Sequence, residues 1–238
     1  MSKEKSNNEI VAHFTAVLEQ YKVYFLELLN AGLAKAKKKI DLVSYWLNDW
    51  LRYLNYEEEY SKKMHPKYKR GSIVQVNLGF NVGSEFGGLH YAITLEKEDN
   101  EKIPNIVIVP LTSIKPTTNI EKLNKDKSRL NIGTYIYDEI TKKTNIEFSD
   151  YLNEIKNTKE KNKLLSKNMN EKAHILQKHF EELDQMKKGT IVLLRQIRVI
   201  SKMRIYAPTN KNDLLNKIRV SEEILNQIDS RLKNLFFN

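Results

Sequence analysis

Residues 70–95 contain the feature that most constrains the fold, a glycine-rich segment between two strand-like segments. Residues 72–78 and 91–95 are rich in β-branched residues at a spacing of two, which predicts two strands. Half of the eight glycines of the chain lie between them, at Gly79, Gly83, Gly87 and Gly88. Glycine permits positive φ and close approach of another group, and hairpin loops usually have about two to five residues. The segment therefore predicts a hairpin with a functional loop, and an ordinary surface loop is the alternative.

The N-terminal quarter of the chain has helical periodicity. Apolar residues recur at three- and four-residue spacing over 10–29 and again over 40–54, which predicts two amphipathic helices. Gly32 is suited to end the first helix. We therefore expect an N-terminal helical hairpin over residues 1–62.

Further strands are expected after the glycine-rich segment. The continuous apolar run 105–109 predicts a strand buried on both faces, and two hydroxyl residues, Thr112 and Ser113, follow it. Shorter strands are predicted at 133–137 and 189–194. A last amphipathic helix begins after Ser221, whose side chain is suited to cap it.

Residues 148–186 are highly charged, with apolar residues at looser helical spacing, and predict one or two helices inserted between strands. The expected fold class is therefore α+β, with a second domain over residues 68–238 that carries this helical insertion. No metal-ligand cluster is evident in the sequence, and no metal or other cofactor is expected.

The composition favours a polyanionic partner. The net charge is +10 and the isoelectric point is about 9.4, which favours nucleic acid, although an AT-rich genome would enrich lysine in the same way. The chain has no cysteine, which fits a reducing cytoplasm. No apolar run approaches the roughly 20 residues of a membrane helix, and the polar N-terminus does not resemble a signal peptide, so no membrane partner is expected.

Three segments together resemble the MazF/PemK family of toxin endoribonucleases in their order and in their placement at strand ends. They are residues 70–95 with the glycine-rich loop, residues 107–113, and residues 189–204, of which the first and third are the more specific. The resemblance covers about residues 68–138 and 187–237. It does not cover the N-terminal hairpin, and 148–186 looks like an insertion into the family fold.

The resemblance implies a small SH3-like antiparallel barrel closed by the C-terminal helix. It also implies a homodimer that cuts single-stranded RNA near its interface without metal. In such enzymes the 2′-hydroxyl of the RNA attacks and leaves a 2′,3′-cyclic phosphate, which requires acid–base groups and positive charge. The implied role is the toxin of a type II toxin–antitoxin system, with an antitoxin protein as partner.

The resemblance assigns catalysis to His90 and Thr112, with Ser113 sharing the role of Thr112. His90 stands where the family usually has an arginine, so this chain departs from the pattern. Histidine carries a proton near neutral pH and is suited to acid–base catalysis; the alternatives are a dead site or one that only binds RNA. Positions matched to the RNA groove are Glu85, Gly87, Gly88, Gln196, Arg198, Lys202 and Arg204, of which Arg198 could instead bridge strands or subunits.

Two other function classes stay open on the sequence. One is a catalytically inactive nucleic-acid-binding regulator, for which the missing arginine would be the reason. The other is a protein-interaction module that targets a protein such as gyrase. For the N-terminal hairpin we expect a dimerisation or scaffolding role, and covering the groove or recruiting a partner are the alternatives.

Overall fold

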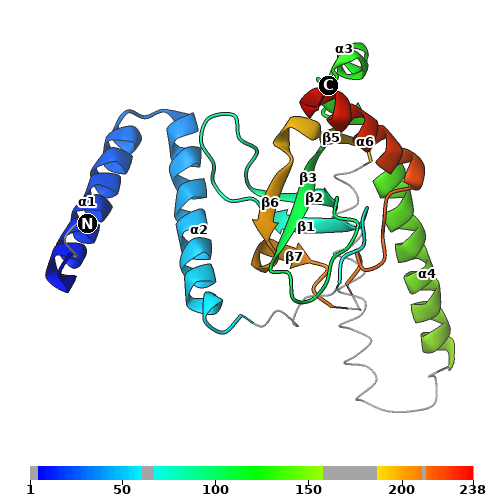
Figure 1. Ribbon diagram of the computed structural model, residues 1–238, viewed down its shortest axis with the longest axis horizontal. Helices are drawn as coiled ribbons and strands as arrows, with labels where there is room; N and C mark the ends of the chain where they lie inside the picture. Colours follow the sequence, from blue (N-terminus) through cyan, green and yellow to red (C-terminus); the bar gives the residue numbers. More distant parts are fainter. Residues whose placement is uncertain (1–4, 61–66, 158–186, 211–212, 238) are drawn as a thin grey trace. The chain divides into compact units, whose positions relative to one another are not determined.

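The computed structural model describes residues 5–60, 67–157, 187–210 and 213–237. Helices and a seven-stranded antiparallel sheet make up the fold, which confirms the α+β class (Figure 1). The chain divides into two compact units, residues 1–59 and 60–238. None of the helices in the described ranges combines the length and hydropathy that a membrane span requires.

The first unit is a helical hairpin of α1 (Asn7–Asn30) and α2 (Ala34–Glu57). Ser6 and Glu9 start α1 with a capping box, in which each side chain accepts a hydrogen bond from the backbone N–H of the other residue. Gly32, at φ 67°, provides the left-handed turn between the helices.

The second unit is built on one antiparallel sheet with the strand order β4-β5-β3-β2-β1-β7. On one edge of β3, the first half of the strand pairs with β6 and the second half pairs with β5. Among the described residues the ladder does not close, because β4 and β7 are its two ends. The strands are β1 (Ile73–Asn77), β2 (Leu89–Thr94), β3 (Asn105–Ser113), β4 (Arg129–Asn131), β5 (Thr190–Leu193), β6 (Arg198–Ser201) and β7 (Ile205–Ala207).

Helices and short 3-10 turns complete this unit. They are α3 (Ile120–Lys125), α4 (Tyr135–Asn157), α6 (Glu222–Phe236), η1 (Leu194–Gln196) and η2 (Lys202–Arg204). Ser221 caps α6 by accepting a hydrogen bond from the Ile224 backbone N–H at 3.3 Å. The strand pair and the C-terminal helix expected from the sequence are therefore present.

Two apolar clusters pack on β3, because its alternate side chains point to opposite faces of the sheet. Val109 and Leu111 belong to the larger cluster, which also contains buried residues of α4 and α6. Ile106 and Ile108 belong to the smaller one. The run of apolar residues in β3 thus reflects burial on both faces, as the sequence indicated.

The strand predicted at 133–137 is wrong. Gly133 has φ 58° and forms a turn, and the Thr134 hydroxyl donates to the Asp138 carboxylate at 2.8 Å, so that α4 starts at Tyr135. The helical insertion predicted at 148–186 therefore begins earlier than its charge pattern indicated, because residues 135–147 already belong to the helix. Residues 158–186 of that prediction lie outside the described part of the chain.

Candidate functional site

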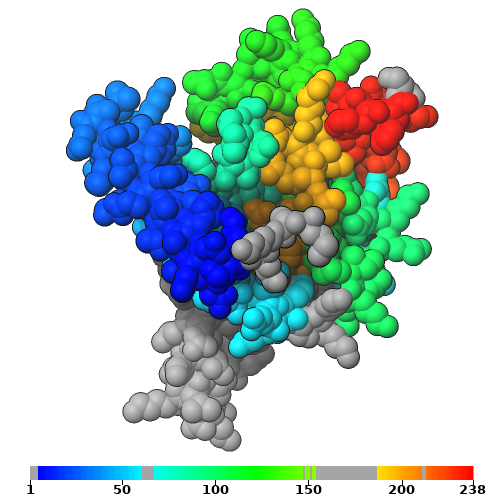
Figure 2. All heavy atoms as spheres, turned by 60° about the vertical axis from the view of Figure 1, so that its left-hand side comes forward, coloured from blue at the N-terminus to red at the C-terminus, as the bar shows by residue number. Residues whose placement is uncertain are grey.

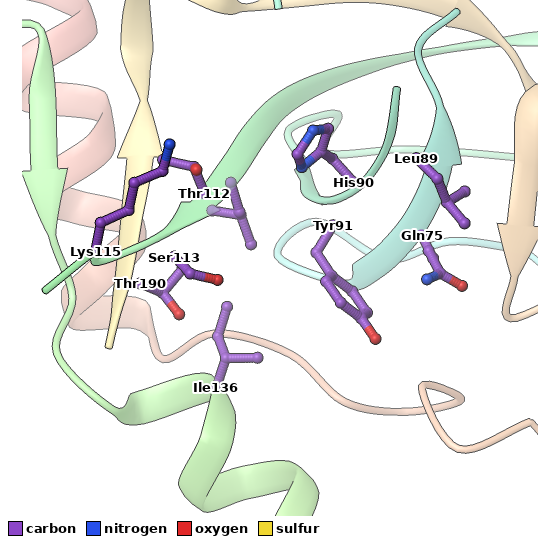
Figure 3. A pocket seen from close by; sticks show the side chains of 10 residues that line it. Gln75, Leu89, His90, Tyr91, Thr112, Ser113, Lys115, Ile136 and Thr190 are labelled. Carbon is purple, nitrogen blue, oxygen red and sulfur yellow. The ribbon is translucent and has the colours of Figure 1, made fainter. Parts of the chain in front are cut away.

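A pocket of about 490 Å³ opens between the ends of β2 and β3 (Figure 3). The paired register of these strands ends at Ala92 and Pro110, and proline has no N–H with which to extend a ladder. Two residues further along the same register, His90 and Thr112 would face each other, and here the pocket separates the strands. The residues that line it are Gln75, Leu89, His90, Tyr91, Leu111, Thr112, Ser113, Lys115, Ile136 and Thr190.

All three residues expected to be catalytic line this one pocket. His90 comes from β2, and Thr112 and Ser113 come from the end of β3 (Figure 3). Ala92 lies two residues after His90 in β2, and Ile108 lies four residues before Thr112 in β3. Ala92 and Ile108 belong to the same apolar cluster. Since side chains two apart in a strand share a face, His90 and Thr112 lie on one face of the sheet.

His90 is half-buried beneath the glycine-rich loop. The ring of Phe86 lies against the imidazole, with centroids 4.1 Å apart and planes inclined at 36°. Burial lowers the pKa of His90 below its ordinary value, and a hydrogen bond to the Gly87 backbone acts in the opposite direction. The imidazole is therefore neutral at pH 7, and a neutral imidazole can accept a proton from a hydroxyl.

The glycine-rich loop, residues 79–88, is held in place by its own hydrogen bonds. The Gly88 N–H donates to the Gly79 carbonyl at 2.8 Å, and the Asn81 side-chain amide donates to the Phe86 carbonyl at 2.8 Å. A Cβ on Gly87 would lie 2.5 Å from the Gly79 carbonyl oxygen, so no larger residue fits without a shift of backbone. This close approach explains why glycine is needed at Gly87.

Gln196 anchors the loop from η1. Its side-chain oxygen accepts the Phe86 backbone N–H at 3.0 Å, and its side-chain amide donates to the Ser84 carbonyl at 3.3 Å. Arg198 donates to the same Gln196 oxygen at 2.9 Å. These two residues were expected to contact RNA, but neither lines the pocket; both position the loop that holds Phe86 over His90.

Of the other residues matched to the RNA groove, Arg204 holds the end of β1 and Glu85 is exposed on the loop. The Arg204 guanidinium donates to the Asn77 carbonyl at 2.8 Å, at the end of β1 where the loop begins. Glu85 is exposed on the loop itself and does not line the pocket. Gly87 and Gly88 likewise shape the loop, and the pocket lining begins just after them.

Lys202 was expected to contact RNA, but the structure buries it. Its side chain is 2% exposed, and its ammonium forms an ion pair with Asp99 and donates to the Asn100 carbonyl at 3.0 Å. The ammonium also lies 5.9 Å from the centre of the Tyr68 ring. A buried ammonium with these partners is not available to a phosphate, so we do not propose Lys202 as an RNA contact.

The sequence reasoning missed Lys115, which lines the pocket just beyond the end of β3. It is the one permanently charged side chain among the described lining residues, and none of these is acidic. Gln75, Tyr91 and Thr190 add further polar groups to the lining. The available signal was the position of Lys115 two residues after Ser113, but it was one of several lysines in a basic segment.

No three His, Asp or Glu side chains are grouped as metal ligands within the described ranges. The arrangement supplies a proton acceptor, hydroxyl donors and one cation around a cavity in the size range of small-ligand sites. The sequence matches no protein-family model and no curated protein.

Proposed function

We propose that this protein is an endoribonuclease that cleaves single-stranded RNA through the 2′-hydroxyl of the RNA itself. The observation that carries the proposal is the meeting of His90, Thr112 and Lys115 around one pocket. The resemblance to the MazF/PemK family supports the same function. The small antiparallel sheet, with α6 packed on its larger apolar cluster, is compatible with the SH3-like barrel of that family.

In this mechanism His90 acts as the base. The neutral imidazole takes the proton of the 2′-hydroxyl, and the 2′-oxygen forms a bond to the adjacent phosphorus. The bond from phosphorus to the 5′-oxygen then breaks, and the imidazolium returns its proton to that oxygen. The products are a 2′,3′-cyclic phosphate and a 5′-hydroxyl, and His90 is neutral again.

Lys115 and the hydroxyls at the end of β3 stabilise the charge that develops at phosphorus. The Lys115 ammonium supplies the fixed positive charge that His90 lacks when it is neutral. Thr112 and Ser113 donate hydrogen bonds to non-bridging oxygens of the phosphate. The catalytic role of the arginine in the family pattern is thus divided here: His90 transfers the proton and Lys115 supplies the charge.

The test is cleavage of unpaired RNA by the purified full-length protein in the presence of EDTA. We expect a 2′,3′-cyclic phosphate product, and loss of cleavage when the nucleotide before the scissile bond is 2′-deoxy. His90→Ala should lower the rate by about 10²–10⁴-fold. His13→Ala, which changes an exposed histidine of α1, is the matched control and should leave the rate unchanged.

RNA binding that weakens with salt, without cleavage of any sequence tested, would reject the nuclease and favour the inactive nucleic-acid-binding module. Cleavage that persists in His90→Ala would reject the mechanism. We extend the proposal to the toxin of a toxin–antitoxin pair on the resemblance alone. Its test is growth arrest on expression of the wild-type protein and normal growth with His90→Ala.

A further inference from the structure

The N-terminal hairpin exposes much of the apolar surface that its helices carry. The apolar stripe of α1 is half-buried at Val17, Phe25 and Leu28, but no residue of α1 is fully buried. The rest of that stripe is about half exposed or more, at Ile10, Phe14, Leu18 and Tyr21. The side chains of α1 form a continuous exposed surface, drawn in blue in Figure 2.

The same pattern continues along α2. Ala36 and Val43, in its first half, are its only buried residues among those described. Trp50, Leu51 and Leu54, in its second half, are about half exposed. Two helices of this kind bury too little apolar surface against each other, which predicts that a further helical layer covers them.

Two clusters of like charge lie at opposite ends of α2. Lys35, Lys37 and Lys38 lie in the first turns of α2, beside the loop that joins the helices. Glu57, Glu58 and Glu59 lie at the opposite, open end. All six are exposed, and none forms an ion pair within the described part of the chain.

This distribution opposes the dipole of α2. The N-terminus of a helix favours negative charge and its C-terminus favours positive charge, whereas α2 has lysines first and glutamates last. In an isolated hairpin the arrangement is unfavourable at both ends. It becomes favourable when an oppositely charged group is brought to each end.

We propose that the hairpin binds a second copy of itself in antiparallel orientation and forms a four-helix bundle. Such a dimer sets the loop end of each hairpin on the open end of the other, so that lysines meet glutamates at both ends. In a parallel dimer the lysine clusters of the two copies would lie against each other and repel. The helices are about 36 Å long, and a face two helices wide is on the order of 700 Å² per copy, near the size of a standard stable interface.

The experiment measures the mass of the full-length protein by sedimentation across a concentration series. We expect a dimer of twice 28.0 kDa that dissociates on dilution. Variant A carries Lys35→Glu, Lys37→Glu and Lys38→Glu, and variant B carries Glu57→Lys, Glu58→Lys and Glu59→Lys. Each reversal suits the dipole of α2, so helix content by circular dichroism should be retained while the dimer weakens on the order of 100-fold.

Mixing the two variants should restore dimers, because α2 of A then has glutamates in both clusters and α2 of B has lysines in both. A chain that carries both sets of reversals should also dimerise as the wild type does. A wild-type protein that is monomeric throughout the series would overturn the proposal. A dimer whose affinity is unchanged in both variants would overturn it too, since its interface would then lie elsewhere.

Discussion

The ring of Phe86 and the imidazole of His90 lie against each other, with centroids 4.1 Å apart. Phe86 belongs to the glycine-rich loop and His90 to the strand that follows it, so the loop determines how much water reaches the imidazole. Gln196 holds the Phe86 backbone from a segment 110 residues later in the chain. The protonation of His90 therefore depends on the loop and on its anchor.

The first prediction concerns the pH dependence of cleavage. Because a base must be unprotonated, the rate should rise with pH through the pKa of His90, which lies below its ordinary value, and level off near neutrality. Phe86→Ala admits water and should move this rise to higher pH. The measurement is the single-turnover rate against pH, with Phe148→Ala, an exposed phenylalanine of α4, as control. A rise that stays in place in Phe86→Ala would show that the ring does not set the pKa.

The second prediction concerns stability at acidic pH. Since the pKa of His90 is lower in the folded than in the unfolded state, the unfolded chain binds more protons between the two values. The folded state is therefore most stable, as far as His90 is concerned, above about pH 6.5, where the side chain is neutral in both states. Its free energy of unfolding decreases as pH falls from there towards the folded-state pKa. The melting temperature of His90→Gln should therefore fall less over this window than that of the wild type. Parallel curves of melting temperature against pH for the two proteins would contradict a lowered pKa of His90 in the folded state.

The third prediction concerns Gly87, where an added Cβ would meet the Gly79 carbonyl oxygen at 2.5 Å. Gly87→Ala should destabilise the protein by about 1–3 kcal/mol and displace His90, with a loss of cleavage on the order of 100-fold. Gly83→Ala is the control. Its added Cβ meets nothing within 4 Å, although its φ of 62° costs about 1–2 kcal/mol. Equal activity in the two variants would mean that the loop does not position the site.

The fourth prediction concerns Lys115. Lys115→Ala should lower the cleavage rate by about 10²–10³-fold and leave the melting temperature unchanged, because the side chain is exposed and lines the pocket. Lys115→Arg keeps the charge and should recover part of the rate. Lys125→Ala, at the end of α3 and outside the pocket, is the control. A rate that survives Lys115→Ala would remove the lysine from the mechanism.

The fifth prediction separates a structural from a binding role for Lys202. Lys202→Met leaves the Asp99 carboxylate buried without its ion pair, which should destabilise the protein by about 3–5 kcal/mol. Adding Asp99→Leu should recover part of that loss, because the uncompensated buried charge is removed as well. Lys188→Met, at an exposed lysine, should be neutral by thermal unfolding. Weaker RNA binding at unchanged stability would instead place Lys202 on the RNA.

Local patterns in the sequence determined where most of the helices and strands of this protein lie. Three- and four-residue spacing placed α1, α2 and α6, and period-two spacing placed β1 and β2, because periodicity reports which side of an element is apolar. A continuous apolar run placed β3, because both of its faces are buried. The glycines marked the loop, and at Gly87 an added Cβ would meet the Gly79 carbonyl oxygen at 2.5 Å. The family resemblance, of which this loop is one part, led to His90, Thr112 and Ser113, and the structure gathers all three in one pocket.

Only the tertiary structure decided which polar groups meet. Lys202 and Asp99 are 103 residues apart, and no local pattern shows that this lysine is buried while Lys115 faces the pocket. Gln196 likewise could be found as a loop anchor only once η1 lay beside the glycine-rich loop. Apolar periodicity is a local property of the chain, whereas the partner of a charge depends on distances that packing alone creates.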